Sequence, residues 1–183
     1  MDFSLTDEQR ALLESVDKML AQHLPADEVR RRDQAHEPPD FLLKHYANLG
    51  LLAIPFPDRY GGLDGAWQTV AVAHERLGYH AAMAASLYGT TLGFGGMSVY
   101  TYGSDTQRET LLPKIIAGDL RFSLGLTEPG AGTDAGALIT RARRGDGGWI
   151  VNGRKTWISG ADQADYIVTA CRTTKGSESN RGI

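Results

Sequence analysis

The sequence has very little that could cross-link the chain or hold it in a membrane. Only one of its 183 residues is a cysteine, Cys171, so no disulfide can form within the chain. No apolar run approaches the roughly 20 residues that a membrane-spanning helix needs. The first residues are polar and acidic, unlike a signal or transit peptide. These absences predict a reduced protein, which we expect to be cytoplasmic and without a membrane span.

Long runs of one charge are also absent. The 22 acidic and 19 basic residues give a formal net charge of -3 and are scattered along the chain. The one basic cluster, Arg30–Arg32, is flanked by Asp27, Glu28 and Asp33, which predicts a solvated helix face. No nucleic-acid partner is expected. The histidines form no visible triad or metal set, so we expect a packing role for His74 and no metal.

The first part of the chain carries helical signals. Thr6–Gln9 and Ser104–Gln107 both match a capping box, in which the two side chains bond each other's backbone amides. Apolar residues at helical spacing follow both boxes and also follow Pro39 and Trp67. A further, buried helix is expected over 81–92.

Glycine and proline are expected to disturb two of these helices. Gly93, Gly95 and Gly96 are expected to interrupt or loosen the helix that precedes them. Pro113 is expected to kink the last helix or split it in two, because proline removes one backbone donor.

After residue 119 the pattern becomes that of strands. Strands are expected over 121–126, 138–144, 149–151, 155–158 and 166–172. Residues 145–148 are expected to turn the chain into the strand at 149–151, and Asn152–Gly153 predicts a further tight hairpin turn. Cys171 is expected to be a buried, inert thiol in the last strand. Helices followed by strands predict an α+β fold.

The end of the sequence suggests that more polypeptide is needed. The polar stretch 173–181 is typical of a loop between two strands, and the expected strands alone would leave an unpaired sheet edge. We therefore expect a chain that is truncated, split or incompletely recorded.

Two glycine-rich segments come close to nucleotide motifs without matching them. Residues 130–136 have one residue too many for G-x-G-x-x-G and lead into a strand instead of a helix. Residues 148–156 place Arg154 where a P-loop needs its lysine. Neither segment predicts a Rossmann or P-loop protein.

The segment 124–134 is the most informative one. Pro129 and three glycines let its backbone turn sharply, and amides together with the hydroxyls of Thr127 and Thr133 suit a phosphate or a heteroaromatic edge. An ordinary structured loop has the same composition, so the residues alone leave both interpretations open.

The residues of this segment resemble a motif of the acyl-CoA dehydrogenase family. Residues 127–134 read TEPGAGTD where the family has T-E-P-x-A-G-[ST]-D, and residues 155–159 read KTWIS where it has K-x-W-I-[ST]. Smaller matches extend the resemblance over nearly the whole chain. It implies an N-terminal all-α domain over 1–119 and a truncated, antiparallel β-barrel-like middle domain over 120–183. The family's C-terminal helical domain would be absent.

The resemblance implies that the first motif binds FAD. Backbone groups of Leu124 and Leu126, with the Thr127 hydroxyl, are implied at the flavin's pyrimidine edge. Gly132 and Thr133 are implied near the pyrophosphate, and Thr133 also at the pantetheine of the CoA substrate.

The second motif is implied to line the same flavin. Trp157 is implied near the dimethylbenzene side, Ile158 beside it, and the Ser159 hydroxyl at flavin N5, where the family more often has threonine. A core aromatic and a turn serine are the structural alternatives. Glu128 is expected to brace the loop instead of acting as a base.

The implied activity is FAD-dependent α,β-dehydrogenation of an acyl-CoA thioester by the full-length protein. The family's catalytic glutamate lies in the C-terminal domain, so this chain is implied to be inactive alone and to bind FAD weakly. An electron-transferring flavoprotein is implied as electron acceptor, and a homotetramer or dimer as the assembly. Acyl length, which the family sets partly through the region 88–96, stays open. A flavin oxidase or monooxygenase on the same fold, or a non-catalytic half-protein with a C-terminal partner, also stays open.

Overall fold

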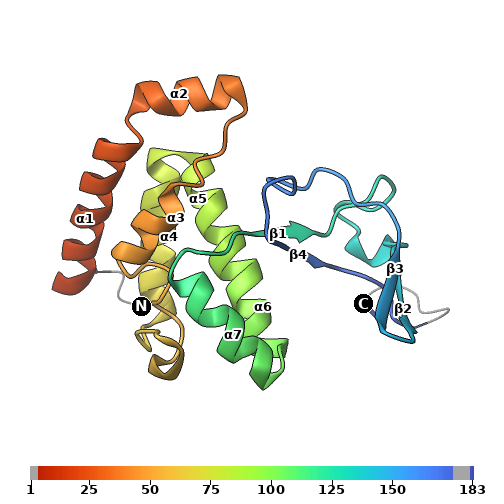
Figure 1. The fold of residues 1–183 in the computed structure, drawn as a ribbon. Helices are drawn as coiled ribbons and strands as arrows, with labels where there is room; N and C mark the ends of the chain where they lie inside the picture. Colours follow the sequence, from red (N-terminus) through yellow and green to blue (C-terminus); the bar gives the residue numbers. More distant parts are fainter. Residues whose placement is uncertain (1–3, 175–181) are drawn as a thin grey trace. The chain divides into compact units, whose positions relative to one another are not determined.

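The structure is a computed structural model that describes residues 4–174 and 182–183 (Figure 1). The chain divides into two compact units, Met1–Arg121 and Phe122–Ile183, which are taken separately below. Helices make up the first unit, and the β-strands lie in the second. The predicted α+β class is therefore confirmed.

Unit 1 is built of helices that follow one another through short loops. Their bounds are α1 Asp7–His23, α2 Ala26–Ala35, α3 Leu42–Asn48, η1 Asp58–Tyr60, α4 Trp67–His80, α5 Ala82–Tyr88, η2 Gly89–Gly96, α6 Met97–Tyr102 and α7 Asp105–Ile116. Both predicted capping boxes are formed, at Thr6 before α1 and at Ser104 before α7. The basic cluster lies on α2, which buries no residue, as predicted for a solvated face.

Two tyrosines mark the centre of the helical core. Tyr46 and Tyr88 are buried and meet edge to face, with ring centroids 5.8 Å apart. Their hydroxyls donate to the carbonyls of Ala84 and Leu51, at 3.0 Å each. Burial raises the pKa of both phenols well above the usual range, because the charged form would be desolvated. His74 packs against Tyr88, in line with the expected packing role.

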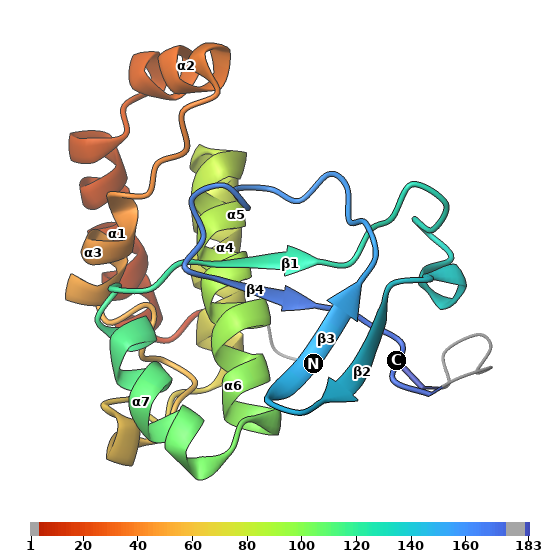
Figure 2. The same ribbon diagram turned by 45° about the vertical axis from the view of Figure 1, so that its right-hand side comes forward.

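The glycines at 93, 95 and 96 loosen their helix without interrupting it. α5 continues through the π-helical segment η2 into α6 (Figure 2). A Cβ on Gly96 would lie 2.6 Å from the ring of buried Phe56, so glycine permits this close approach. Pro113 lies inside α7, and the predicted split of that helix is wrong.

Unit 2 contains two small sheets. Its elements are β1 Phe122–Gly125, η3 Ala135–Ala137, β2 Arg141–Gly145, β3 Gly148–Asn152 and β4 Tyr166–Thr169. β2 and β3 form an antiparallel hairpin, whereas β1 and β4 pair in parallel, Phe122 opposite Tyr166 (Figure 2). The expectation of an antiparallel arrangement is therefore wrong for β1 and β4. Parallel pairing is possible because a long crossover joins these strands. Within the described residues the two sheets do not close into a barrel.

Several predicted strand boundaries are corrected by the structure. The hairpin turn lies at Asp146–Gly147, within the turn expected at 145–148. The turn predicted at Asn152–Gly153 is wrong, since neither residue has the positive φ that a type I′ turn requires. The segment 155–158 is not a strand, because its polar groups bond the loop after β1 instead. The segment 138–144 becomes a strand only at Arg141.

The last predicted strand is also shorter than expected. β4 ends at Thr169, so Cys171 lies beyond it and is half-buried instead of buried. Partial burial raises the pKa of its thiol. Most of the predicted loop 173–181 lies outside the described residues. In the part of the chain that the structure describes, every helix is too short or too polar to cross a membrane.

Candidate functional site

A buried ion pair organises the first motif. Glu128, only 4% exposed, accepts hydrogen bonds from the amides of Ile139 and Thr140 at 2.7 and 2.9 Å. The ammonium group of Lys155 donates to the same carboxylate at 2.9 Å and to the carbonyl of Leu126 at 3.0 Å. One carboxylate thus connects the first motif to the start of the second and to the segment before β2.

The environment of Glu128 holds it in its charged form. Burial would raise its pKa, but the amide of Ile139 and the ammonium group of Lys155 bond the carboxylate and lower the pKa to about 2. A carboxylate with so low a pKa is a very weak base. Glu128 therefore serves as a brace, as expected from the sequence.

Two further hydrogen bonds bring the motifs together. The amide of Thr156 donates to the carbonyl of Thr127 at 2.9 Å. The hydroxyl of Ser123, on β1, donates to the carbonyl of Ser159 at 2.9 Å. Residues that are about 30 positions apart are thereby fixed side by side within unit 2.

These contacts leave several polar groups of the two motifs available. Within residues 4–174 and 182–183, no hydrogen-bond partner is recorded for the Thr127 hydroxyl, the Leu126 amide or the Ser159 hydroxyl. Leu124 and Ile158, which lie close to these residues in the sequence, are half-buried. Donors therefore remain for a ligand with a polar edge.

Trp157 is the most unusual side chain of the second motif. Its indole is 88% exposed and its backbone adopts a positive φ of 58°. A large aromatic side chain rarely takes this conformation, and a positive φ in a non-glycine residue occurs most often where the surroundings impose it. The core-aromatic alternative is wrong, and the exposed ring face is free for stacking.

The glycine loop that follows Glu128 is open. Glu128 and Ala131 exchange two backbone hydrogen bonds, 2.9 and 3.1 Å long, which form a tight turn. A Cβ built on Gly130 or Gly132 would have no atom within 4 Å, and Thr133 is exposed. Backbone groups here can be approached closely by a ligand.

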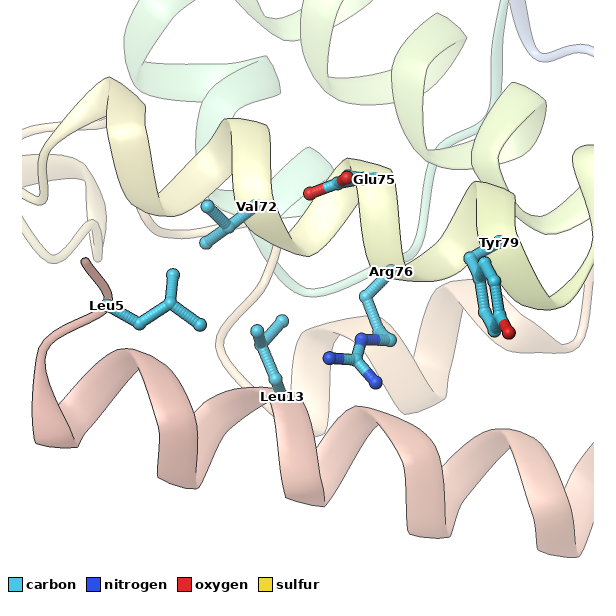
Figure 3. Close-up of a pocket in the computed structure, with 6 residues that line it drawn as sticks. All are labelled: Leu5, Leu13, Val72, Glu75, Arg76 and Tyr79. Atoms are coloured by element: carbon cyan, nitrogen blue, oxygen red, sulfur yellow. The ribbon is translucent and has the colours of Figure 1, made fainter. Parts of the chain in front are cut away.

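Unit 1 holds a separate groove of about 520 Å³ between α1 and α4, lined by Leu5, Leu13, Val72, Glu75, Arg76 and Tyr79 (Figure 3). Arg76 forms an ion pair with Asp17 at 3.1 Å. None of the residues predicted for a site lies here. Among the described residues there is also no group of three metal-ligating side chains.

Comparison with known proteins decides the family. The family model for the acyl-CoA dehydrogenase N-terminal domain matches residues 6–119, and that for the middle domain matches residues 123–183. The chain belongs to the acyl-CoA dehydrogenase family. It is 34% identical over 178 residues to the probable acyl-CoA dehydrogenase YngJ of Bacillus subtilis, covering 97% of this chain and 47% of that protein.

Solved structures of acyl-CoA dehydrogenase relatives share the fold. A glutaryl-CoA dehydrogenase from Mycobacterium smegmatis in complex with FADH2 matches with a TM-score of 0.84 and 28% identity, over 94% of this chain and 44% of the other. A structure concerning the electron transferring flavoprotein of Acidaminococcus fermentans matches with a TM-score of 0.86 and 30% identity, over 96% and 46%. The chain thus spans about half the length of its relatives.

Part of this site was not visible in the sequence. Ser123 carries no motif signal, although its hydroxyl holds the backbone of Ser159. Lys155 belongs to the second motif, but its two bonds to Glu128 and Leu126 depend on the fold.

Proposed function

We propose that the protein to which this chain belongs is an FAD-dependent acyl-CoA dehydrogenase, and that this chain forms part of its flavin and substrate site. The observation that carries the proposal is the joining of the two motifs by Lys155 and Thr156. This joining places the exposed indole of Trp157 and the unpaired hydrogen-bond donors in unit 2. Such a set suits a flat heteroaromatic ring with a polar edge.

Each predicted residue has a place in this proposal. Leu124, Leu126 and Thr127 would hold the pyrimidine edge of FAD through backbone groups and a hydroxyl. The open backbone at Gly132 and Thr133 would approach the pyrophosphate, and Thr133 would also bind the pantetheine of the substrate.

The second motif would form the other side of the ring site. Trp157 would stack on the flavin, Ile158 would line it, and the Ser159 hydroxyl would donate to its N5. When bound, FAD supplies the acceptor for a hydride from the β-carbon of the acyl group. The residues of this chain would orient the ring.

The base that removes the α-proton is proposed to lie outside these 183 residues. Glu128 is unsuited to the role, because it is buried and three donors hold it charged. The same proposal includes an acyl-CoA substrate, an electron-transferring flavoprotein as acceptor, a homo-oligomer and a cytoplasmic location. The π-helical segment η2 is proposed to contact the acyl chain, since π-helical turns are frequent at functional sites.

Flavin fluorescence titration of the 183-residue chain tests the proposal. We expect weak FAD binding and no dehydrogenation of acyl-CoA, because the base and part of the cofactor site are proposed to lie outside these residues. Trp157→Ala should weaken FAD binding about tenfold, because a stacking contact is lost. Trp149→Ala is the matched control, a half-exposed tryptophan of the same unit that should leave binding unchanged.

Two results would contradict the proposal. Tight stoichiometric FAD binding with turnover by this chain would show that the site is already complete. Equal effects of the two tryptophan substitutions would show that the exposed indole of Trp157 does not contact the flavin.

A further inference from the structure

One face of β2 carries a row of arginines that the flavin site does not use. Arg141 and Arg143 are two residues apart on the strand and therefore project to the same side of the sheet. Across the hairpin, Arg141 is paired with Asn152 of β3. On its other side it is bridged in parallel to Arg172, whose amide donates to Thr140 at 2.8 Å. Two strands and the segment after β4 thus contribute to one face.

A concavity of about 300 Å³ lies over this row, which we call the arginine cleft. It is lined by Arg141, Ala142, Arg143, Asn152, Arg172, Thr173 and Thr174. Apart from Ala142, each of these side chains can donate hydrogen bonds, and none is acidic. The lining is suited to an anion and unsuited to a metal cation or an acyl chain.

The base of the arginine cleft is rigid. Arg172 is only 9% exposed, and its guanidinium group donates to the carbonyl of Leu138 at 2.7 Å and to that of Gly136. The positive charge of Arg172 is therefore held in place by the backbone, whatever else contacts the group.

Arg141 and Arg143 have no carboxylate partner among the described residues, unlike several arginines of unit 1. In unit 1, Arg10, Arg76 and Arg108 each form an ion pair. Arg141 and Arg143 are exposed, and neither forms an ion pair within the described ranges. Basic residues outnumber acidic ones in unit 2, although the whole chain is acidic. Arg141 and Arg143 thus bring two positive charges to the cleft that no carboxylate of the described residues pairs with.

We propose that the arginine cleft binds a phosphate ester dianion of the kind carried by a nucleotide. Guanidinium groups match the oxygens of a phosphate with paired, charge-assisted hydrogen bonds. The amide of Asn152 supplies a further donor in the same row. The two sources with this chemistry are the 3′-phosphate of CoA and a free nucleotide. This inference stands on β2 and its neighbours and does not require the flavin assignment.

Calorimetric titration of the 183-residue chain with adenosine 3′,5′-bisphosphate tests the arginine cleft, with adenosine as the uncharged comparison. Arg141→Gln and Arg143→Gln should each weaken binding about tenfold, because each removes a charged donor pair. Arg144→Gln is the matched control. It lies on the same strand but on the opposite face, over the ring of Trp149, and should leave binding unchanged.

A comparison of CoA with dephospho-CoA separates the two sources. Tighter binding of CoA, lost in Arg141→Gln, would assign the phosphate to the substrate. Equal binding of both, with the bisphosphate still dependent on Arg141, would assign it to a free nucleotide. If the bisphosphate does not bind, or if Arg144→Gln weakens binding as much as Arg141→Gln, the proposal is wrong. Thermal unfolding of each variant confirms that the exposed substitutions leave the fold intact.

Discussion

The stability of the candidate site depends on the buried charge of Glu128. The carboxylate of Glu128 accepts hydrogen bonds from two backbone amides and one ammonium group, all from other segments of the chain. Removing one partner of a buried pair leaves the other charge uncompensated, which destabilises a protein more than the pair itself stabilises it. Unit 2 should therefore be sensitive to this residue.

Glu128→Gln tests this dependence. We expect it to lower the free energy of unfolding of unit 2 by about 3 kcal/mol, because Lys155 would remain buried without its counter-charge. Urea unfolding measures the change. Asp134→Asn, which neutralises an exposed carboxylate of the same unit, should change stability little. A similar loss in both variants would contradict a structural role for the buried pair.

The same residue predicts a pH dependence. The pKa of Glu128 is lowered from 4.5 to about 2 in the folded chain, so its contribution to stability is complete above pH 4.5. The contribution should be lost progressively as the pH falls from 4.5 towards 2. Glu128→Gln should lack this component of the acid sensitivity, which unfolding at a series of pH values would reveal.

Gly153 is required for close packing and not for a turn. A Cβ at this position would lie 2.2 Å from Oγ1 and 2.6 Å from Cα of Thr140, which is itself buried. Gly153→Ala should therefore cost about 2 kcal/mol, as overpacking typically does. Gly147→Ala, with nothing within 4 Å, is the control for thermal unfolding. A neutral Gly153→Ala would show that this approach is not tight.

At the level of elements, the π-helical segment η2 shows what glycine does in a helix. The sequence predicted a disturbance at Gly93–Gly96, and the structure shows that the helix widens and continues. The reason is tertiary, since Phe56 occupies the space beside Gly96. The two glycines at the ends of this stretch therefore have different roles.

Two alanine substitutions distinguish these roles. Gly96→Ala should destabilise unit 1 by about 1–3 kcal/mol, because the new methyl group would meet the ring of Phe56 at 2.6 Å. A Cβ at Gly93 would meet no atom within 4 Å, so Gly93→Ala should stabilise the helix by roughly 0.5 kcal/mol. Thermal unfolding measures both. Equal effects would contradict the packing argument.

Among the features of the elements, strand pairing was predicted least well from the sequence. Alternation located most of the strands, but Asn152–Gly153 indicated a hairpin that does not form. The backbone there instead fits against Thr140, and Lys155 bonds the loop after β1. Local strand preferences span about 1 kcal/mol, whereas a buried polar group left unpaired costs about 1–3 kcal/mol. Tertiary contacts therefore prevail.

At the scale of the whole molecule, unit 2 exposes apolar side chains along β3. Trp149, Ile150 and Val151 are 52%, 41% and 51% exposed. Because side chains alternate along a strand, Trp149 and Val151 share one face of β3 and Ile150 lies on the other. Exposed apolar side chains that share a face mark sites that other protein surfaces cover. We therefore expect the 183-residue chain to self-associate.

Light scattering at increasing concentration checks this expectation. The double substitution Trp149→Ser and Val151→Ser should reduce association, because it removes apolar area from one face of β3. Tyr79→Ser and Tyr102→Ser, which remove single exposed aromatics of unit 1, serve as controls. An unchanged apparent mass in the β3 variant would rule out this strand as the contact.

The sequence by itself determined the helices, their capped ends and the family, because these depend on neighbouring residues or on short motifs. Only the tertiary structure decided the parallel pairing of β1 with β4, the pairing of Glu128 with Lys155 and the exposure of Trp157. Each of these joins segments far apart in the chain. Their stability comes from burial and from charge compensation between distant residues, and neither is encoded in a local pattern.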